Sequence, residues 1–170
     1  MTMTAARRPR GFTLIEIIVT LVLLGLLGAT VFGFMGQAVR GFFIARDALE
    51  ITQKAQIALN RMRIELTYLQ KTPLPTGTAT SINYTANFPD GAENNTIAFD
   101  NANGRITFNG VTLIDDVGGL TFSYYNDPSD TAPASSYQAS TTLVGITLVM
   151  LDSDGNTATF TTRVVPGKIT

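Results

Sequence analysis

The chain has 170 residues, which is enough for one ordinary domain and a membrane anchor, and its formal net charge at pH 7 is −1. It contains no cysteine to form a disulfide bond or act as a thiolate nucleophile. It also contains no histidine, the commonest general base and transition-metal ligand in proteins. Both absences argue against an enzyme.

Charged residues are distributed unevenly along the chain. Three arginines crowd the first ten residues, and the only charged residue between them and Arg40 is Glu16. Beyond residue 72 the chain is acidic, with nine Asp and Glu residues against three Lys and Arg residues. The unequal distribution predicts a basic start, an apolar anchor and an acidic domain.

Residues 12–36, FTLIEIIVTLVLLGLLGATVFGFMG, are apolar apart from Glu16 and scattered threonines. At a rise of about 1.5 Å per residue, roughly 20 residues span the hydrocarbon core of a bilayer, and residues 17–36 supply that length. Because the arginines precede this segment, the positive-inside rule places residues 1–10 in the cytoplasm and the chain after about residue 37 outside. We therefore predict a single-pass membrane protein.

A secretory signal peptide is the alternative interpretation of a basic start followed by an apolar run. Its apolar region is usually about 7–15 residues long and ends at a small-residue cleavage site. Here the run is longer, and the best such site, Gly28-Ala29-Thr30, is poor and lies inside it. We therefore expect the apolar segment to be retained.

Glu16 needs an explanation, because a carboxylate at the centre of a membrane costs about 2.5–3.5 kcal/mol on insertion scales. The cost is smaller near the end of the segment, where the side chain can reach the headgroups. A second interpretation is that Glu16 pairs with a cation in the membrane plane. Cleavage between Gly11 and Phe12 would create an amine with a pKa of about 7.7–8, mostly protonated at neutral pH. Such a pair is strong in a low dielectric and would fix the register between neighbouring helices.

The residues around this position, RGFTLIE from Arg10 to Glu16, resemble the class III signal of type IV pilins and type II secretion pseudopilins. In that family a prepilin peptidase cuts after the glycine of a short basic leader and methylates the new N-terminal phenylalanine. The resemblance implies cleavage after Gly11, methylation of Phe12, and neutralisation of a neighbouring subunit's amine by Glu16 during assembly. It also implies the partners and the location: the peptidase, membrane lipid before assembly, other pilins, an inner-membrane assembly platform, and finally a pilus or pseudopilus with its C-terminal domain outside the inner membrane.

Helical patterning continues beyond the membrane segment. Apolar or small residues recur three or four positions apart, which is typical of one stripe of an amphipathic helix; they are Phe42, Ala45, Leu49, Thr52, Ala55, Leu59, Met62, Leu66 and Leu69. Because Pro73 and Pro75 end the pattern, we expect one helix over residues 12–71. Pilins often have a helix-breaking proline where this chain has Gly33. The glycines of the segment indicate either close helix packing or local melting during extraction from the membrane.

The pattern changes after Pro75 to short strand-like runs separated by turns. The runs cover residues 81–86, 96–100, 105–108, 111–114, 120–125, 143–151 and 157–165, and Asn109-Gly110 is a strong two-residue hairpin turn. We predict an α+β fold, in which the long N-terminal helix packs on one face of an antiparallel β-sheet. The expected domains are a leader at 1–11, a transmembrane and assembly helix at 12–36, an amphipathic helix at 37–71 and a β-rich domain at 72–170.

Residues 58–168 carry a second, looser resemblance, to the J-type minor pseudopilins and the W-type minor pilins. It covers ALNRMRIELTYLQ, the hairpins around NANGRITFNGVTLIDDVGGLTFSYYND, and VGITLVMLDSDGNTATFTTRVVPGK. This resemblance implies a low-copy subunit near the filament tip that helps to start assembly. Major pilins often have a C-terminal disulfide loop, from which this cysteine-free chain departs.

Two acidic pairs have the composition of a candidate site. Asp152 and Asp154 match a fragment of a calcium loop, but the acidic ligand that an EF-hand loop needs about twelve positions from its first Asp is missing, and a polar hairpin turn explains both residues. Asp115-Asp116 has the form of a carboxylate pair for acid–base work, for which a solvated turn is the simpler explanation. No catalytic residue, metal or cofactor is therefore expected.

Two other functions remain open. A minor pilin that binds DNA for uptake would need clustered Lys and Arg, which the acidic region after residue 72 opposes. A single-pass, membrane-anchored periplasmic binding module that never polymerises would share the anchor, but it would need neither cleavage at Gly11 nor the carboxylate of Glu16.

Overall fold

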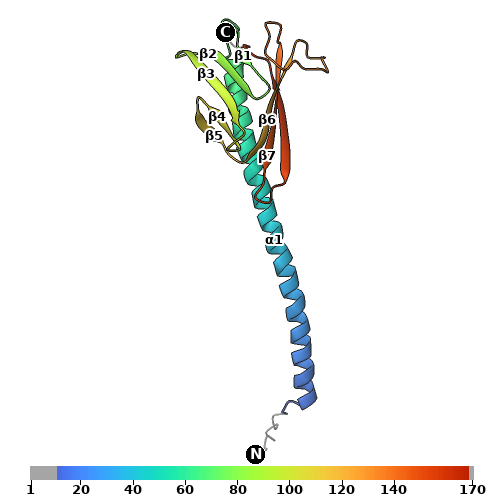
Figure 1. The fold of residues 1–170 in the computed structure, drawn as a ribbon. Helices are drawn as coiled ribbons and strands as arrows, with labels where there is room; N and C mark the ends of the chain where they lie inside the picture. Colours follow the sequence, from blue (N-terminus) through green and yellow to red (C-terminus); the bar gives the residue numbers. More distant parts are fainter. Residues whose placement is uncertain (1–10, 169–170) are drawn as a thin grey trace, which may run out of the picture. The chain divides into compact units, whose positions relative to one another are not determined.

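The structure is a computed structural model that describes residues 11–168, in which one helix is followed by eight strands (Figure 1). The chain divides into two compact units, Met1–Ala45 and Arg46–Thr170, here called unit 1 and unit 2. A single helix, α1 (Leu14–Thr67), begins in the first and ends in the second.

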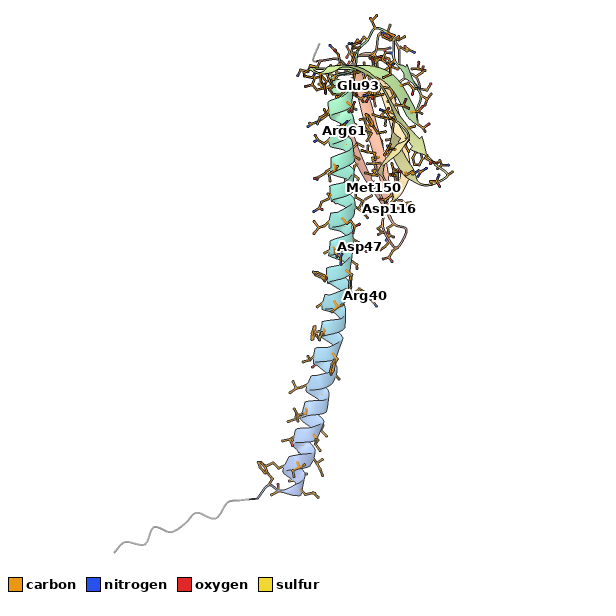
Figure 2. The ribbon with its side chains drawn as sticks, turned by 90° about the vertical axis from the view of Figure 1, so that its left-hand side faces the viewer. Arg40, Asp47, Arg61, Glu93, Asp116 and Met150 are labelled. Carbon is orange, nitrogen blue, oxygen red and sulfur yellow. The ribbon has the colours of Figure 1, made fainter. Side chains whose placement is uncertain are left out.

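In unit 1, α1 is apolar around its whole circumference, and its large side chains are exposed on all sides (Figure 2). A helix that is hydrophobic all round belongs either in a protein core or in a membrane. The apolar stretch of α1 is long enough to cross a membrane, and none of it is buried within the structure.

In unit 2, α1 is amphipathic, as the sequence predicts. Its buried positions recur every three or four residues, with two adjacent residues at the last step, and are Ile51, Ala55, Ala58, Met62, Glu65 and Leu66. The stripe differs from the predicted one at its start, because Leu49 is 61% exposed and Ile51 is buried instead. The two alanines leave little side chain between the helix backbone and the strands.

The helix ends at Thr67, four residues before the predicted end at residue 71. The backbone beyond it pairs with a strand instead: Gln70 N donates to Thr85 O at 2.7 Å and Asn87 N donates to Tyr68 O at 2.9 Å. These bonds satisfy groups that a longer helix would have used, so the chain leaves α1 before the prolines are reached.

The first five strands form one antiparallel sheet in the order in which they occur in the chain. They are β1 (Thr76–Gly77), β2 (Ser81–Phe88), β3 (Gly91–Asp100), β4 (Arg105–Phe108) and β5 (Val111–Ile114). The predicted turn joins β4 to β5, with φ of 51° at Asn109 and 79° at Gly110. Positive φ at both central residues is what a type I′ hairpin turn requires.

The last three strands form a second antiparallel sheet in the order β6-β7-β8. Their bounds are β6 (Val117–Tyr125), β7 (Leu143–Leu151) and β8 (Thr157–Val164). The predicted α+β class, with a long N-terminal helix against antiparallel strands, is confirmed, but the strands form two sheets rather than one. The chain changes sheet at Asp115-Asp116, where Asp116 has φ of 57°, a left-handed conformation that Asp tolerates.

The hydrophobic core lies in unit 2 between α1 and the two sheets. All of its members fall between Ile51 and Val164, and the largest of the fully buried side chains include Met62, Ile82, Ile97, Phe122, Tyr124, Ile146 and Met150. Since every one of these residues is in unit 2, the globular unit carries its own core.

Candidate functional site

The segment before α1 presents the predicted cleavage site. Gly11, Phe12 and Thr13 lie outside regular secondary structure, and all three are exposed. Phe12 is 79% exposed, and a Cβ placed on Gly11 would meet no atom within 4 Å. The peptide bond between Gly11 and Phe12 is therefore accessible. The leader arginines, Arg7, Arg8 and Arg10, lie outside the described residues.

Glu16 lies in the first turn of α1. The carbonyl oxygen of Thr13 accepts hydrogen bonds from the backbone N–H groups of Glu16, at 3.1 Å, and of Ile17, at 3.3 Å, so Thr13 occupies the N-cap position. The sequence from Thr13 to Glu16 has the Thr-x-x-Glu pattern of a capping box. A carboxylate there is also favoured by the positive end of the helix dipole.

The carboxylate of Glu16 is exposed, and within residues 11–168 it makes neither an ion pair nor a hydrogen bond. Its neighbours are large exposed apolar side chains, with Ile15 at 66% and Ile17 at 48% exposure. When lipid or other helices cover these side chains, the carboxylate lies in a low dielectric, where its attraction to a cation is strongest. The arrangement suits a carboxylate whose partner belongs to another chain.

The glycines of unit 1 lie on open helix surface. A Cβ placed on Gly25, Gly28, Gly33, Gly36 or Gly41 would meet no atom within 4 Å. Small residues let a neighbouring helix approach closely, which favours the packing interpretation. The helix is continuous through Gly33, where pilins often have proline.

The two other acidic candidates have structural partners. The carboxylate of Asp152 accepts hydrogen bonds from the backbone N–H of Asp154, at 3.0 Å, and from the backbone N–H of Asn156, at 2.6 Å. The side-chain amide of Asn156 also donates to Asp152, at 2.8 Å, and this bond, followed by the backbone bonds, lowers the pKa of Asp152. Together these bonds hold the turn between β7 and β8. Within residues 11–168 no group of three or more Asp or Glu side chains is arranged to hold a metal ion. The polar-turn interpretation thus accounts for the geometry at Asp152.

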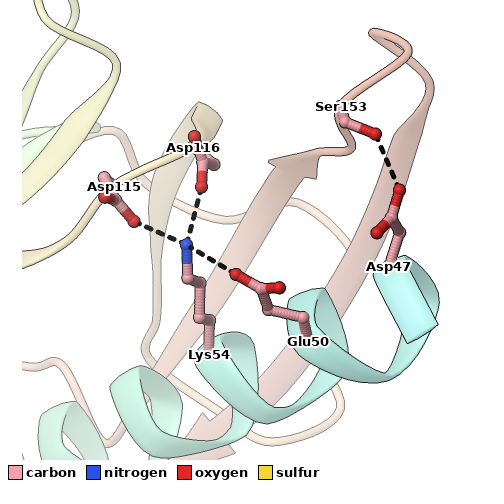
Figure 3. A network of polar contacts seen from close by, with 6 residues as sticks. All are labelled: Asp47, Glu50, Lys54, Asp115, Asp116 and Ser153. Atoms are coloured by element: carbon pink, nitrogen blue, oxygen red, sulfur yellow. Dashed lines mark hydrogen bonds and ion pairs between the residues drawn. The ribbon is translucent and has the colours of Figure 1, made fainter. Parts of the chain in front are cut away.

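Asp115 and Asp116 form an ionic cluster with α1 (Figure 3). The Nζ atom of Lys54 lies 2.9 Å from Asp115 and 2.7 Å from Asp116, and 3.5 Å from Glu50. The bonds to Asp116 and Asp115 raise the pKa of Lys54, and the bond from Lys54 lowers the pKa of Asp115. Asp47, which accepts a bond from Ser153 at 2.7 Å, lies at the same end of unit 2 as Asp116 (Figure 2), and both line one small pocket. Through Lys54, Asp115 and Asp116 attach the connection between β5 and β6 to α1.

The sequence did not reveal two polar contacts of α1. Lys54 binds the acidic pair between β5 and β6, and Glu65 accepts hydrogen bonds from Tyr84 and Asn95. Lys54 lies four residues after Glu50, and Glu65 occupies a stripe position next to Leu66. An acidic residue on the buried stripe of a helix was the available indication that a polar contact is buried there.

Comparison with known proteins identifies one motif. Residues 6–32 match the prokaryotic N-terminal methylation motif, and this range contains Gly11, Phe12 and Glu16. No curated protein and no solved structure matches the chain.

Proposed function

We propose that the chain is a structural minor subunit of a type IV pilus or a type II secretion pseudopilus, because residues 6–32 match the prokaryotic N-terminal methylation motif, which supports membership of the type IV pilin and pseudopilin family. The observation that carries this proposal is the exposed carboxylate of Glu16 in the first turn of an apolar helix, four residues after Phe12. The chemistry at the N-terminus then belongs to the prepilin peptidase, and this chain is its substrate.

The peptidase cuts between Gly11 and Phe12 and methylates the amine of Phe12. The exposure of both residues and their position outside the helix support this assignment. A protease needs an extended, accessible segment, and a peptide bond inside a helix would have to be unwound first.

After cleavage, the Glu16 carboxylate pairs with the protonated amine of Phe12 in a neighbouring subunit. The apolar surroundings have already removed most of the water from Glu16, so forming the ion pair adds little further desolvation penalty. The amine then compensates a negative charge that would otherwise be unpaired in a low dielectric. It therefore fixes the axial register of adjacent helices, while the exposed apolar side chains of unit 1 supply the packing surface.

Before assembly, the protein is anchored in the inner membrane through residues 12–36, with residues 1–11 as a cytoplasmic leader. Residues 37–67 continue the helix, and the chain then leads into a periplasmic, β-rich domain at 72–170. Its partners are membrane lipid, the assembly platform and other pilins, and it moves from the membrane into the filament.

We place the subunit near the filament tip as an initiator of assembly. The support is the looser resemblance of residues 58–168 to the J-type pseudopilins and W-type minor pilins, together with the absence of the cysteines that form a disulfide loop in many major pilins.

The experiment that tests the proposed function is mass spectrometry of the mature N-terminus, in membrane and sheared-filament fractions. We expect N-methylated Phe12 in both fractions. Gly11→Val, which places a bulky side chain at the cut, should accumulate as uncut precursor, whereas Gly11→Ala should be cut more readily. Intact Met1, or cleavage near Ala29, would contradict the proposal and favour the anchored binding module that does not polymerise.

A further inference from the structure

Strand β8 is the outer strand of the three-stranded sheet and has a strand neighbour on one side only. It runs for eight residues, TATFTTRV, and its only charged residue is Arg163. Natural proteins protect such edges with short strands, charges, prolines or a cover, because an open edge pairs with other chains. In the five-stranded sheet the outer strands β1 and β5 are only two and four residues long. Strand β8 lacks that protection.

A groove lies where the end of β8 meets the last turns of α1. Its volume is about 640 Å³, and its walls come from Arg63 and Ile64 on the helix side and from Arg163, Val165 and Lys168 on the strand side. Ile64 is 41% exposed and Val165 is 49% exposed, so the groove offers apolar contact as well as charge.

The groove is cationic and contains no acidic side chain in its lining. Within the described residues, Arg63, Arg163 and Lys168 make no ion pair. Two of them are nevertheless held in place: Arg163 lies over the ring of Tyr125 at 5.1 Å, and Arg63 donates to Asn60 Oδ1 at 2.9 Å. Positioned cations without anionic partners favour a ligand that supplies carboxylates.

We infer that the open edge of β8, together with this groove, binds an extended acidic segment of another polypeptide as an added strand. The backbone of the segment pairs with β8, and its carboxylates reach Arg163 and Lys168 on the strand side of the groove. Side chains alternate along a strand, so the segment places acidic or polar residues on the face of Arg163 and apolar residues on the face of Phe160, which packs against the core.

Two other occupants fit less well. Nucleic acid would satisfy the cations, but it has no peptide backbone to pair with the strand edge. A second copy would bring the cation Arg163 on its own β8 and no carboxylate, so two such edges would repel each other.

The test is selection from a displayed library of random eight-residue segments on the full chain in lipid nanodiscs. Two variants are screened in parallel. One is the double variant Arg163→Glu/Lys168→Glu, and the other is the single variant Lys168→Glu, which keeps the contact between Arg163 and Tyr125. The matched control is Arg46→Glu, an exposed cation of unit 2 outside the groove. Unchanged melting temperatures establish that the variants are folded.

We expect the enriched segments to alternate acidic and apolar residues and to slow amide hydrogen exchange in Thr157–Val164. Their affinity should fall at least tenfold in the double variant, should fall with added salt, and should be unchanged in Arg46→Glu. Methylation of alternate backbone nitrogens in the peptide should abolish binding. The inference is overturned if no segment is enriched, if the methylated peptide binds equally well, if a DNA duplex binds the groove more tightly, or if a second copy occupies the edge. Each of these results is independent of whether Phe12 is processed.

Discussion

Glu16 and Glu65 are both carboxylates in apolar surroundings, and they differ in where their partners come from. Glu65 is fully buried, and its Oε1 lies 2.7 Å from Arg61 Nη2. Its Oε2 accepts bonds from the hydroxyl of Tyr84, at 2.9 Å, and from the amide of Asn95, at 3.1 Å. Burial and then the charge of Glu65 raise the pKa of Tyr84, which keeps this hydroxyl a donor. Glu65 finds an ion-pair partner and two hydrogen-bond donors in its own chain, although the contact from Arg61 to its Oε1 lacks hydrogen-bond geometry. Glu16, in contrast, is exposed in unit 1.

Replacement of Glu16 by alanine or glutamine should leave membrane insertion intact, because it removes a charge that opposes insertion. Incorporation into filaments should fall strongly, because no carboxylate then meets the amine of the neighbouring subunit. The measurement is the ratio of variant protein in sheared-filament and membrane fractions. Thr20→Val, which changes a polar residue one turn further along α1, is the control. Wild-type incorporation of Glu16→Ala would refute the pairing mechanism.

Replacement of Glu65 by alanine should destabilise unit 2 by about 3 kcal/mol, because it leaves the buried donors of Tyr84 and Asn95 without an acceptor. Removing one partner of a buried ion pair costs about 3–5 kcal/mol of folding stability. We expect the lower value here, because the side chain of Arg61 is 51% exposed and stays hydrated.

Tyr84→Phe is the matched control and should cost only about 1 kcal/mol, because it removes one of several bonds to Glu65. Urea unfolding in detergent, followed by the near-ultraviolet circular dichroism of the tyrosines, measures both variants. Equal stability of Glu65→Ala and the wild type would mean that water reaches this position.

At the scale of elements, the sequence predicts most strands because their residues alternate or are β-branched and because strong turns separate them. The first half of β3, Gly91–Asn95, was missed because its side chains are polar, although every residue pairs with β2. Asn95 is buried, and its side-chain amide donates to Glu65, which lies 30 positions away in the sequence. No local sequence pattern reveals such a contact. Strand β1 was missed because two residues carry no periodicity; Gly77 is needed there, since a Cβ would contact Tyr124 and Tyr137. The motif near the N-terminus is local, so the sequence alone names Gly11, Phe12 and Glu16 as the candidate site residues.

The cluster around Lys54 joins α1 to the connection between β5 and β6, where the chain passes from one sheet to the other. Lys54→Met should cost about 1 kcal/mol at neutral pH, because all three carboxylates are more than half exposed and solvent weakens their attraction. Lys71→Met, at a lysine without an ion pair among the described residues, is the control.

The pH dependence of that difference follows from the pKa shifts. Because the pKa of Asp115 is lowered in the folded chain, its stabilising contribution is complete above its usual value of 3.8 and is lost as the pH falls through the lowered value. Because the pKa of Lys54 is raised, its contribution is complete below its usual value of 10.5 and is lost only as the pH rises through the raised value. Thermal unfolding should therefore show a constant difference across the neutral range and a smaller one in strong acid. A difference that grows in acid would contradict the assignment.

At the scale of the whole molecule, the two units meet different physical requirements. All residues of the hydrophobic core lie between Ile51 and Val164, so folding of unit 2 needs nothing from unit 1. Unit 1 exposes its apolar side chains on all sides and is stable only where lipid or other helices cover them. When the chain passes from the bilayer into a filament, only the surroundings of unit 1 change. The globular unit therefore does not have to refold, because its core contains no residue of unit 1.

This separation predicts that a fragment covering residues 46–170 folds by itself, stays soluble without detergent and unfolds at the same urea concentration as unit 2 of the full chain. A fragment that begins at Leu59 is the control, because it lacks Ile51, Ala55 and Ala58 of the buried stripe as well as Lys54. It should unfold at clearly lower urea, since each lost apolar contact removes part of the helix–sheet packing. Circular dichroism and size-exclusion chromatography measure both. If the longer fragment were unfolded or aggregated, residues of unit 1 would have to contribute to the stability of unit 2, and transfer from membrane to filament would then involve the globular unit as well as the anchor.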